Sequence, residues 1–279
     1  MFDITRAYGL TFLFPAADSA VGACLREYGE FARCEADLIG AYLTEFAVPG
    51  TFIDVGANLG AICLPVAKAR PEWRIMAFEA HRGMAGVLAA NALNNDLLNV
   101  EYNHAAVGGE AGIARFPAIS LAENVNFGGM SMTLESRTAT EPVRMCRLDD
   151  VAPTDTRFIK VDVEGFEPEV LRGASALLAR QEVVWLLEAK RQDMALAQSV
   201  MQVLKDARYR IFLFFAPFVG GVSSKSGSRL AELKGDFNFL ALPPGVPNIW
   251  NLPELDALDT PWPTNIEAYA YLAAYGFKF

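Results

Sequence analysis

The stretch of the chain with the most distinctive chemistry is KVDVEGFEPEVLRGA at residues 160–174. It places Asp162 and Glu164 at the end of an apolar, strand-like run, directly before Gly165. In open α/β sheets, ligands bind outside the carboxyl ends of the strands. A carboxylate at that position is able to accept a proton from a reacting group. We therefore predict Asp162 and Glu164 as catalytic residues, with His104 as a third candidate base.

The same acidic residues have other interpretations. Acids at the start of a helix complement its dipole, and we accept this explanation for Glu167 and Glu169 but not for the two predicted catalytic residues. Three acids also offer hard oxygen ligands suited to magnesium: Asp162, Glu164 and Glu188. Ion pairing with neighbouring cations is the favoured alternative, so we predict no resident metal. The cations in question are Lys160, Lys190 and Arg191.

A second chemistry-bearing stretch, FIDVGANLG at residues 52–60, joins a strand-like run to a turn with two glycines. Glycines there let a ligand approach the backbone closely, and free N–H groups at a helix start favour an anionic group. The spacing is G-x-x-x-G rather than the dinucleotide pattern G-x-G-x-x-G. Asp54, just before the turn, suits an ammonium group better than a pyrophosphate. A ligand with both a carboxylate and an ammonium, such as S-adenosylmethionine, fits this combination.

Glu79 follows Asp54 by 25 residues and ends the next strand-like run. An acid at that place accepts hydrogen bonds from both ribose hydroxyls, whereas its alternative role is that of a solvated charge at a strand end. His104, Ala105 and Ala106 close the third run and are placed to line an adenine, although His104 is equally compatible with a polar residue beside the cleft. The predicted cofactor-binding residues are Asp54, Gly56, Asn58, Gly60, Glu79 and Ala106.

From residue 51 onward, short apolar runs alternate with longer amphipathic runs, which predicts a parallel sheet with helices on both faces. The predicted strands are 51–55, 74–79, 100–107, 158–163, 183–188, 209–215 and 237–242. The predicted helices are 58–70, 83–94, 167–179 and 192–206. A Gly/Ser-rich loop joins the last two strands, so we expect a hairpin and one antiparallel edge strand. Residues 108–151 are less regular, and residues 127–132 are placed to cover the cofactor or contact substrate.

Three segments follow from this pattern. Residues 1–48 are predicted as an N-terminal helical segment with one or two helices in 19–47, residues 49–243 as the cofactor-binding domain, and residues 244–279 as an aromatic C-terminal extension. The tail aromatics either wall an acceptor pocket or bury a homodimer surface, with ordinary packing as the alternative. They are Trp250, Trp262, Tyr269, Tyr271 and Tyr275.

Composition excludes several classes of function. The chain has 279 residues, 52% of them apolar, and a net charge of −9. It has no Lys/Arg run, so we expect no nucleic-acid binding. Four cysteines without a CxxC pair and only two histidines argue against structural zinc and for free thiols in the cytoplasm. The longest apolar run, 211–222, is too short to span a bilayer, and the apolar residues 7–17 are interrupted by Gly9 and Pro15, which argues against a targeting signal.

The motifs together resemble the FkbM-type methyltransferases, within the S-adenosylmethionine-dependent class. The resemblance spans residues 50–190 and rests on FIDVGANLG, FEA at 78–80, AAVGG at 105–109 and KVDVEGFEPEVLRGA. It implies a Rossmann-like class I fold with a seven-stranded, mostly parallel sheet. It also implies O-methylation of a hydroxyl on a sugar or other small-molecule acceptor. The chain departs from the family at Pro65 and in its long aromatic tail.

The resemblance also assigns roles to the residues singled out above. Asp54, Gly56, Asn58 and Gly60 would hold the methionine end of the cofactor, Glu79 the ribose, and Asp162 and Glu164 would border the reacting methyl group. Two other functions remain as alternatives. A methyltransferase-like module without catalysis would use its surface for partner binding. A nicotinamide-dependent oxidoreductase would need the G-x-G-x-x-G turn that this chain lacks at the expected place.

Overall fold

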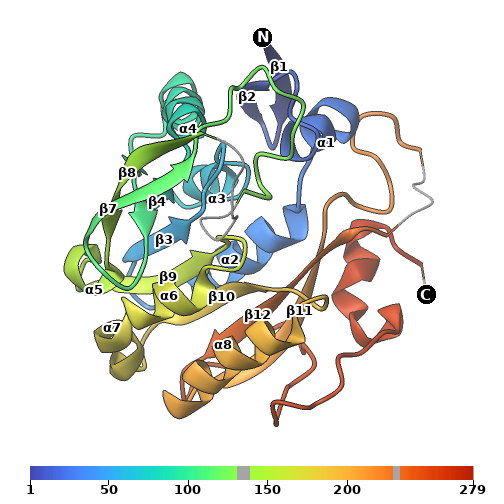
Figure 1. The fold of residues 1–279 in the computed structure, drawn as a ribbon. Coiled ribbons are helices and arrows are strands. Elements are labelled where there is room, and N and C mark those ends of the chain that lie inside the picture. The colour runs from blue at the N-terminus through green and yellow to red at the C-terminus, as the bar shows by residue number, and fades with distance from the viewer. Residues whose placement is uncertain (131–138, 229–232, 279) are drawn as a thin grey trace.

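A seven-stranded sheet forms the centre of the computed structural model, which describes residues 1–130, 139–228 and 233–278 (Figure 1). The strand order is β11-β12-β10-β9-β3-β4-β5, with β12 antiparallel to both of its neighbours and the other pairs parallel. The predicted Rossmann-like architecture is therefore confirmed, but the antiparallel strand lies one place in from the edge. The strands are β3 (Thr51–Val55), β4 (Arg74–Glu79), β5 (Val100–His104), β9 (Thr156–Val161), β10 (Val184–Ala189), β11 (Arg210–Pro217) and β12 (Gly235–Leu242).

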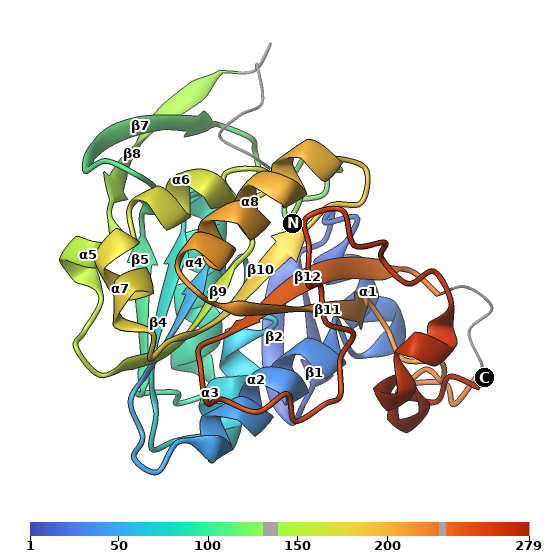
Figure 2. The same cartoon turned by 90° about the horizontal axis from the view of Figure 1, so that it is seen from below.

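Helices cover both faces of this sheet (Figure 2). Alternate strand residues point to opposite faces, so Phe52 and Phe158 belong to one buried cluster, whereas Ile53 and Ile159 belong to another. The first cluster is covered by α2, α3 and α4 and the second by α6, α7 and α8. The helices are α1 (Val21–Tyr28), α2 (Arg33–Glu45), α3 (Cys63–Ala69), α4 (Arg82–Asn94), α5 (Leu148–Val151), α6 (Glu167–Arg172), α7 (Ser175–Arg180) and α8 (Met194–Asp206).

The same alternation gathers polar side chains on one face at the carboxyl end of the parallel strands. Asp54 follows Phe52 by two residues and pairs in register with Lys160, which follows Phe158 by two. One strand further along, Glu188 pairs in register with Asn238 of β12. Each of these four polar residues is at least nine-tenths buried. The face of the sheet that carries the first buried cluster thus has buried polar and charged side chains at its carboxyl end.

The predicted helix over 58–70 begins only at Cys63. Gly56, Asn58 and Gly60 all have φ in the left-handed region, at 85°, 51° and 91°, which excludes a helix through them. The late start also explains why Pro65 is tolerated. It is the third residue of α3, and the N–H groups of the first turn have no partner within a helix.

Two further predicted elements are divided in the structure. The helix over 167–179 is split into α6 and α7 at Gly173, whose position against the carbonyl oxygen of Gly108 leaves no room for a side chain. The strand over 100–107 is split at Ala105, because β6 (Ala106–Val107) joins a second sheet. This three-stranded sheet also contains β7 (Gly112–Pro117) and β8 (Thr140–Cys146), so the region 108–151 is more ordered than its sequence suggests.

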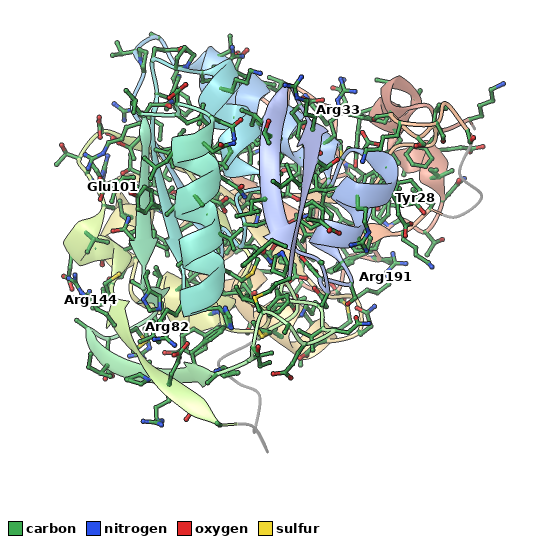
Figure 3. The ribbon with its side chains drawn as sticks, turned by 90° about the horizontal axis from the view of Figure 1, so that it is seen from above. Tyr28, Arg33, Arg82, Glu101, Arg144 and Arg191 are labelled. Carbon is green, nitrogen blue, oxygen red and sulfur yellow. The ribbon has the colours of Figure 1, made fainter. Side chains whose placement is uncertain are left out.

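The N-terminal segment is not wholly helical as predicted, because it begins with a hairpin of β1 (Phe2–Ala7) and β2 (Leu10–Pro15). Tyr8 and Gly9 have φ of 55° and 70°, and positive values at both positions are what a tight two-residue turn requires. Figure 3 shows the hairpin between α4 and α1. The side chains of Asn91 and Asn95 on α4 hydrogen-bond the backbone of β2.

The aromatic tail packs onto the last two strands and ends in two short 3-10 turns, Ile266–Ala268 and Ala270–Tyr275. Trp250 contacts the ring of Phe214 and Trp262 contacts the rings of Phe237 and Phe239. The structure therefore shows ordinary packing, the alternative given for these residues, at Trp250 and Trp262. Within the described part of the chain, no helix has the length and apolar character needed to cross a bilayer.

The break between α6 and α7 supports a first prediction. We expect Gly173→Ala to lower the free energy of unfolding by about 1–3 kcal/mol, because its Cβ would lie 2.1 Å from the carbonyl oxygen of Gly108. Gly86→Ala on α4 is the control, because nothing lies within 4 Å of its added Cβ. That variant should instead gain about 0.5–1 kcal/mol. Urea unfolding measures both, and equal stability of the two variants would contradict the packing argument.

Candidate functional site

Two cavities adjoin at the carboxyl end of the parallel strands. The first, of about 50 Å³, lies between the ends of β3 and β4 and the link from β5 to β6. The second, of about 320 Å³, lies between the turn after β3, helix α1 and the start of β12. Both are lined by Gly56, Asn58, Gly128 and Asp162. They are therefore the two halves of one cleft, and Asp162 stands where the halves meet.

Asp54 is the most unusual side chain of the second cavity. It is fully buried yet lines this cavity. Neither of its carboxylate oxygens has a donor in ordinary hydrogen-bond geometry among the described residues, but the Cys63 thiol and the ammonium of Lys160, whose Nζ lies 3.7 Å from Oδ1, both interact with it. Burial raises the pKa of Asp54, and the ammonium of Lys160 opposes this rise. A buried acceptor without a donor is costly, so Asp54 is suited to a cationic donor from outside the protein.

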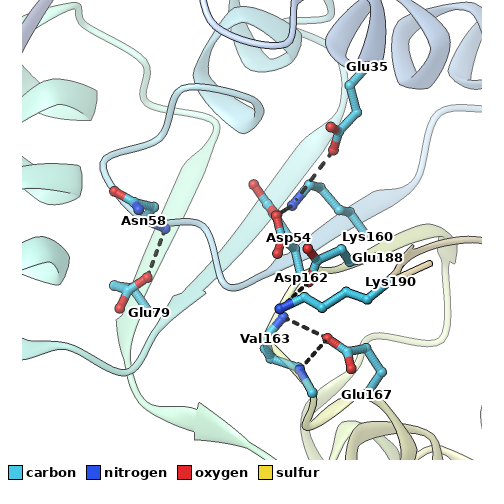
Figure 4. A network of polar contacts seen from close by, with 11 residues as sticks. Glu35, Asp54, Asn58, Glu79, Lys160, Asp162, Val163, Glu167, Glu188 and Lys190 are labelled. Carbon is cyan, nitrogen blue, oxygen red and sulfur yellow. Dashed lines mark hydrogen bonds and ion pairs between the residues drawn. The ribbon is translucent and has the colours of Figure 1, made fainter. Parts of the chain in front are cut away.

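Lys160 is the centre of a buried ionic cluster (Figure 4). Its Nζ lies 3.0 Å from Asp162 Oδ2 and 3.7 Å from both Asp54 Oδ1 and Glu35 Oε1. Burial opposes the charge of Lys160, but the three carboxylates outweigh it and raise its pKa. Burial raises the pKa of Glu35 to about 8, although Lys160 opposes the shift. The floor of the cleft thus holds one fixed positive charge among three acids.

The backbone N–H groups of the turn after β3 already have hydrogen-bond acceptors in the protein. The amides of Gly56 and Ala57 both donate to Phe78 O at 2.9 Å, and the amide of Leu59 donates to Asn58 Oδ1. The N–H groups that we expected to be free are therefore paired between residues 56 and 60. They also do not form the start of a helix, since α3 begins later than predicted. Gly56 remains indispensable to the geometry, since an added Cβ would lie 1.8 Å from the carbonyl oxygen of Asp162.

Glu79 lines the first cavity and is bonded to two backbone amides. Asn58 N donates to Glu79 Oε2 at 2.8 Å, and His81 N donates to Oε1 at 2.7 Å. Burial raises the pKa of Glu79 to about 7, although these amides oppose the shift. Ala106 and Ala105 also line this cavity, whereas His104 is exposed, contacts Ala80 O at 3.2 Å and lines neither cavity. The structure does not bring His104 together with Asp162 and Glu164.

Apolar side chains form the rest of the first cavity. Phe116 of β7 and the loop residues Phe127 and Met130 line it, together with Phe78. His81, which sequence reasoning did not single out, packs edge-on against Phe116 and Phe127. Of the predicted covering segment 127–132, residues 127, 128 and 130 line the cavity, and residues 131 and 132 lie outside the described part of the chain.

The predicted catalytic acids lie in a turn rather than on a strand, because β9 ends at Val161. Glu164 and Gly165 both have left-handed backbone, with φ of 56° and 93°. The amides of Val163 and Gly165 donate to Glu167 Oε1 at 3.3 and 3.1 Å. Glu167 stands in the first turn of α6, where an acid is expected to complement the helix dipole, and it is also a buried brace of the preceding turn. The turn presents Asp162 and Glu164 to the second cavity.

The three acids considered as metal ligands do converge. One oxygen each from Asp162, Glu164 and Glu188 lies within 4.8 Å of the others. The ion pairs set against a metal are also present: Lys160 with Asp162, and Lys190 with both Glu164 and Glu188. Arg191 takes no part, because its guanidinium donates to Trp262 O and Pro263 O.

Sequence reasoning missed residues that only the fold brings to the cleft. Asp236, at the start of β12, lines the second cavity, and its enclosed setting and the neighbouring Asp162 raise its pKa to about 6. Phe31 and Phe218 stack with ring centres 5.6 Å apart at the same cavity. None of these residues stands in a motif. For Asp236 the signal is the antiparallel return of β12, which places the start of that strand beside the ends of the others, whereas Phe31, in the link between α1 and α2, has no such signal.

The chain matches a known protein family and is similar to several solved structures. Residues 54–211 match the family model of the methyltransferase FkbM domain. The chain is similar to precorrin-6y C5,15-methyltransferase from Geobacter metallireducens, with 16% identity over 75% of this chain and 87% of that one and a TM-score of 0.46. Comparison with the curated proteins gave no match.

Two further solved structures are similar. Methyltransferase FkbM from Methylobacillus flagellatus shares 14% identity over 72% of this chain, with a TM-score of 0.44, and this chain covers 50% of its length. An S-adenosylmethionine-dependent methyltransferase from Agrobacterium tumefaciens shares 12% identity over 87% of this chain and 70% of that one, with a TM-score of 0.50. At such identity the last likeness shows the fold alone, which is the class I Rossmann-like fold.

The setting of Glu79 predicts a pH dependence of stability. Its pKa is about 7 in the folded protein against an ordinary 4.5, so the folded state binds more protons than the unfolded state between these values. The free energy of unfolding therefore falls as pH rises through this window. Relative to Glu79→Gln, the wild type should lose about 3 kcal/mol.

Urea unfolding at several pH values checks this difference. Glu72→Gln is the control, because Glu72 is an exposed acid just before β4. Its stability should follow that of the wild type at every pH. Parallel curves for wild type and Glu79→Gln would show that Glu79 ionises normally.

Proposed function

This chain belongs to the FkbM methyltransferase family, and from that membership we propose that it transfers the methyl group of S-adenosylmethionine to a hydroxyl oxygen of a sugar or other natural-product acceptor. The family makes it an S-adenosylmethionine-dependent methyltransferase. The oxygen acceptor is our proposal. The observation that carries the proposed site is Asp54, which is fully buried, has no donor in ordinary hydrogen-bond geometry among the described residues and lines the second cavity.

The methionine end of the cofactor fits beside Asp54. An ammonium group supplies the donors that both Asp54 oxygens lack, and its charge offsets the acidic floor around Lys160. Gly56 allows the ligand to approach the backbone of the turn, because the position carries no side chain. Asn58 lines both halves of the cleft and connects the two ends of the site. Gly60 packs closely against Leu64 and Leu88, which leave no room for a side chain at this position of the turn.

We assign the nucleoside end to the first cavity, whose side chains have to move apart to admit it because the cavity holds only about 50 Å³. Each Glu79 oxygen accepts one backbone amide, and a carboxylate oxygen has a second lone pair for a ribose hydroxyl. Ala106, Phe116 and Phe127 supply the apolar contacts that a flat base requires. We therefore assign the ribose to Glu79 and the base to the walls formed by these three residues.

The remaining space of the second cavity is assigned to the acceptor. When bound, the sulfonium group supplies an electrophilic methyl, so the protein has to align a hydroxyl oxygen and accept its proton. Asp162 stands at the junction of the two halves, which makes it our proposed base. Glu164 lines only the acceptor half and is assigned to hold the acceptor. Phe31 and Phe218 provide an apolar wall for its scaffold.

Two alternatives are less well supported. A nicotinamide cofactor would place a pyrophosphate against Asp54, and its G-x-G-x-x-G turn is lacking. A non-catalytic module would not need three acids presented to an open cavity. The three-segment division of the chain, the cytoplasmic location and a homodimer stay predictions. The four free cysteines agree with a reducing compartment.

Ligand-induced stabilisation tests the cofactor site. We expect S-adenosylhomocysteine to raise the melting temperature of the protein and NAD to leave it unchanged. Asp54→Asn should weaken binding of S-adenosylhomocysteine by about 10–100-fold, the free energy of a hydrogen bond to a charged group. Isothermal titration calorimetry measures the affinity.

The matched control is Asp259→Asn, because Asp259 is an exposed acid of the C-terminal tail. Its affinity should equal that of the wild type. Unchanged affinity of Asp54→Asn for S-adenosylhomocysteine would contradict the assignment of Asp54 to the cofactor site. Stabilisation by NAD alone would indicate an oxidoreductase instead of the proposed methyltransferase.

The role of Asp162 makes a separate prediction. Asp162→Asn should lower kcat by about 10²–10⁴-fold, the usual contribution of a general base, and should leave the affinity for S-adenosylhomocysteine within a few-fold of wild type. The measurement is transfer of isotope-labelled methyl groups from S-adenosylmethionine to a panel of hydroxylated glycosides and polyketide-like alcohols. Labelling of nitrogen or carbon instead of oxygen would refute the proposed acceptor.

A further inference from the structure

Lys190 occupies a position that neither the family motifs nor the proposed transfer assigns. It follows β10 directly, and its ammonium forms an ion pair with Glu164 and lies 3.7 Å from Glu188 Oε2. Figure 4 shows Lys190 beside Glu188 and Asp162 at the edge of the Lys160 cluster. The question is what a second lysine does at this place.

The carboxylates around Lys190 are spaced as the ligands of a divalent cation are spaced. Oxygens of Asp162, Glu164 and Glu188 lie within 4.8 Å of one another, and a hard cation bound by oxygen ligands brings them to such separations. Burial, followed by the neighbouring Asp162, raises the pKa of Glu188 to about 10, because acids at this distance in a partly enclosed site disfavour one another's charge. Lys160 compensates only Asp162 of the three.

Glu164 also needs an external constraint. Its φ of 56° is a left-handed conformation that residues with a side chain rarely adopt. The conformation directs its carboxylate into the second cavity, where the side chain is 18% exposed. The ion pair with Lys190 is the side-chain contact that the structure shows for this carboxylate.

We propose that Lys190 is a built-in cation: its ammonium takes the place among Asp162, Glu164 and Glu188 that a divalent metal ion would otherwise occupy, and it holds Glu164 toward the acceptor cavity. Lys190 is thus a positioning residue. The consequence for catalysis rests on the proposed function, whereas the cation-replacing role stands on the contacts alone. The wild type consequently has no site for a divalent cation here, and removal of the ammonium creates one.

Manganese binding to the full chain tests this role without any substrate. Calorimetric titration with Mn²⁺ should show no saturable site in the wild type. Lys190→Met should bind one Mn²⁺ with a Kd of about 10⁻⁴ M or tighter, since Glu164 and Glu188 then lose their ion pairs with Lys190 and are available as oxygen ligands beside Asp162. Lys190→Arg keeps the charge and should bind none. The double variant Lys190→Met with Glu188→Gln should lose the new site.

Lys278→Met is the control, because Lys278 is an exposed lysine near the C-terminus, and it should behave as the wild type. Lys190→Gln replaces Lys190→Met if thermal melting shows that the methionine variant is unfolded. Mn²⁺ binding to the wild type with an affinity equal to that of the Lys190→Met variant would overturn the proposal. Absence of binding in every folded, uncharged variant at position 190 would overturn it as well.

Turnover adds an independent readout. Lys190→Met should lower kcat about tenfold, as loss of a residue that orients a reacting group does, while its affinity for S-adenosylhomocysteine stays unchanged. Lys190→Arg should restore most of the rate, and Mn²⁺ should raise the rate of Lys190→Met but not of the wild type. If no variant binds S-adenosylhomocysteine, the proposed function fails while the Mn²⁺ titrations still decide the role of Lys190.

Discussion

One buried ammonium group sets the character of the whole cleft. Lys160 lies on the central strand β9 and meets acids from β3, from the turn after β9 and from α2. One ammonium does not balance three acids, but burial raises the pKa of Glu35 to about 8 and also raises that of Asp54, which favours their neutral forms. This rise and the ammonium of Lys160 together allow Asp54 to be kept in the interior without a donor in ordinary hydrogen-bond geometry. The binding chemistry of the site is in this sense a property of the sheet core.

Much of the fold could be predicted from periodicity. The strands β3 and β4 match their predicted bounds, and the long apolar runs identify the other strands of the central sheet. The errors have local physical causes. Left-handed residues between 56 and 60 make α3 begin late, and close contact with Gly108 divides the helix predicted over 167–179. The turn of Tyr8 and Gly9 forms a hairpin in the apolar run that was considered as a targeting signal. None of these causes is visible in a pattern of apolar residues.

The site divides in the same way. The residues that lie in motifs, such as Asp54, Glu79 and Asp162, line the cleft where the strand ends place them. Glu35 and Asp236 could not be found, because each reaches the cleft from an element distant in sequence and carries no local signature. The prediction of free amides in the turn at residues 56–60 was wrong for another reason. Phe78 O takes two of them, a pairing that depends on the neighbouring strand.

The reversed direction of β12 has a consequence for how this scaffold diversifies. The half of the cleft that we assign to the nucleoside is drawn from one continuous portion of the chain, residues 55–166, whereas Phe31, Phe218 and Asp236, in the half that we assign to the acceptor, come from the flanking portions on either side. Insertions or exchanges in those flanks would reshape the acceptor half and leave the nucleoside half intact. Chimeric proteins that exchange only the flanks offer a direct route to altered acceptor selectivity.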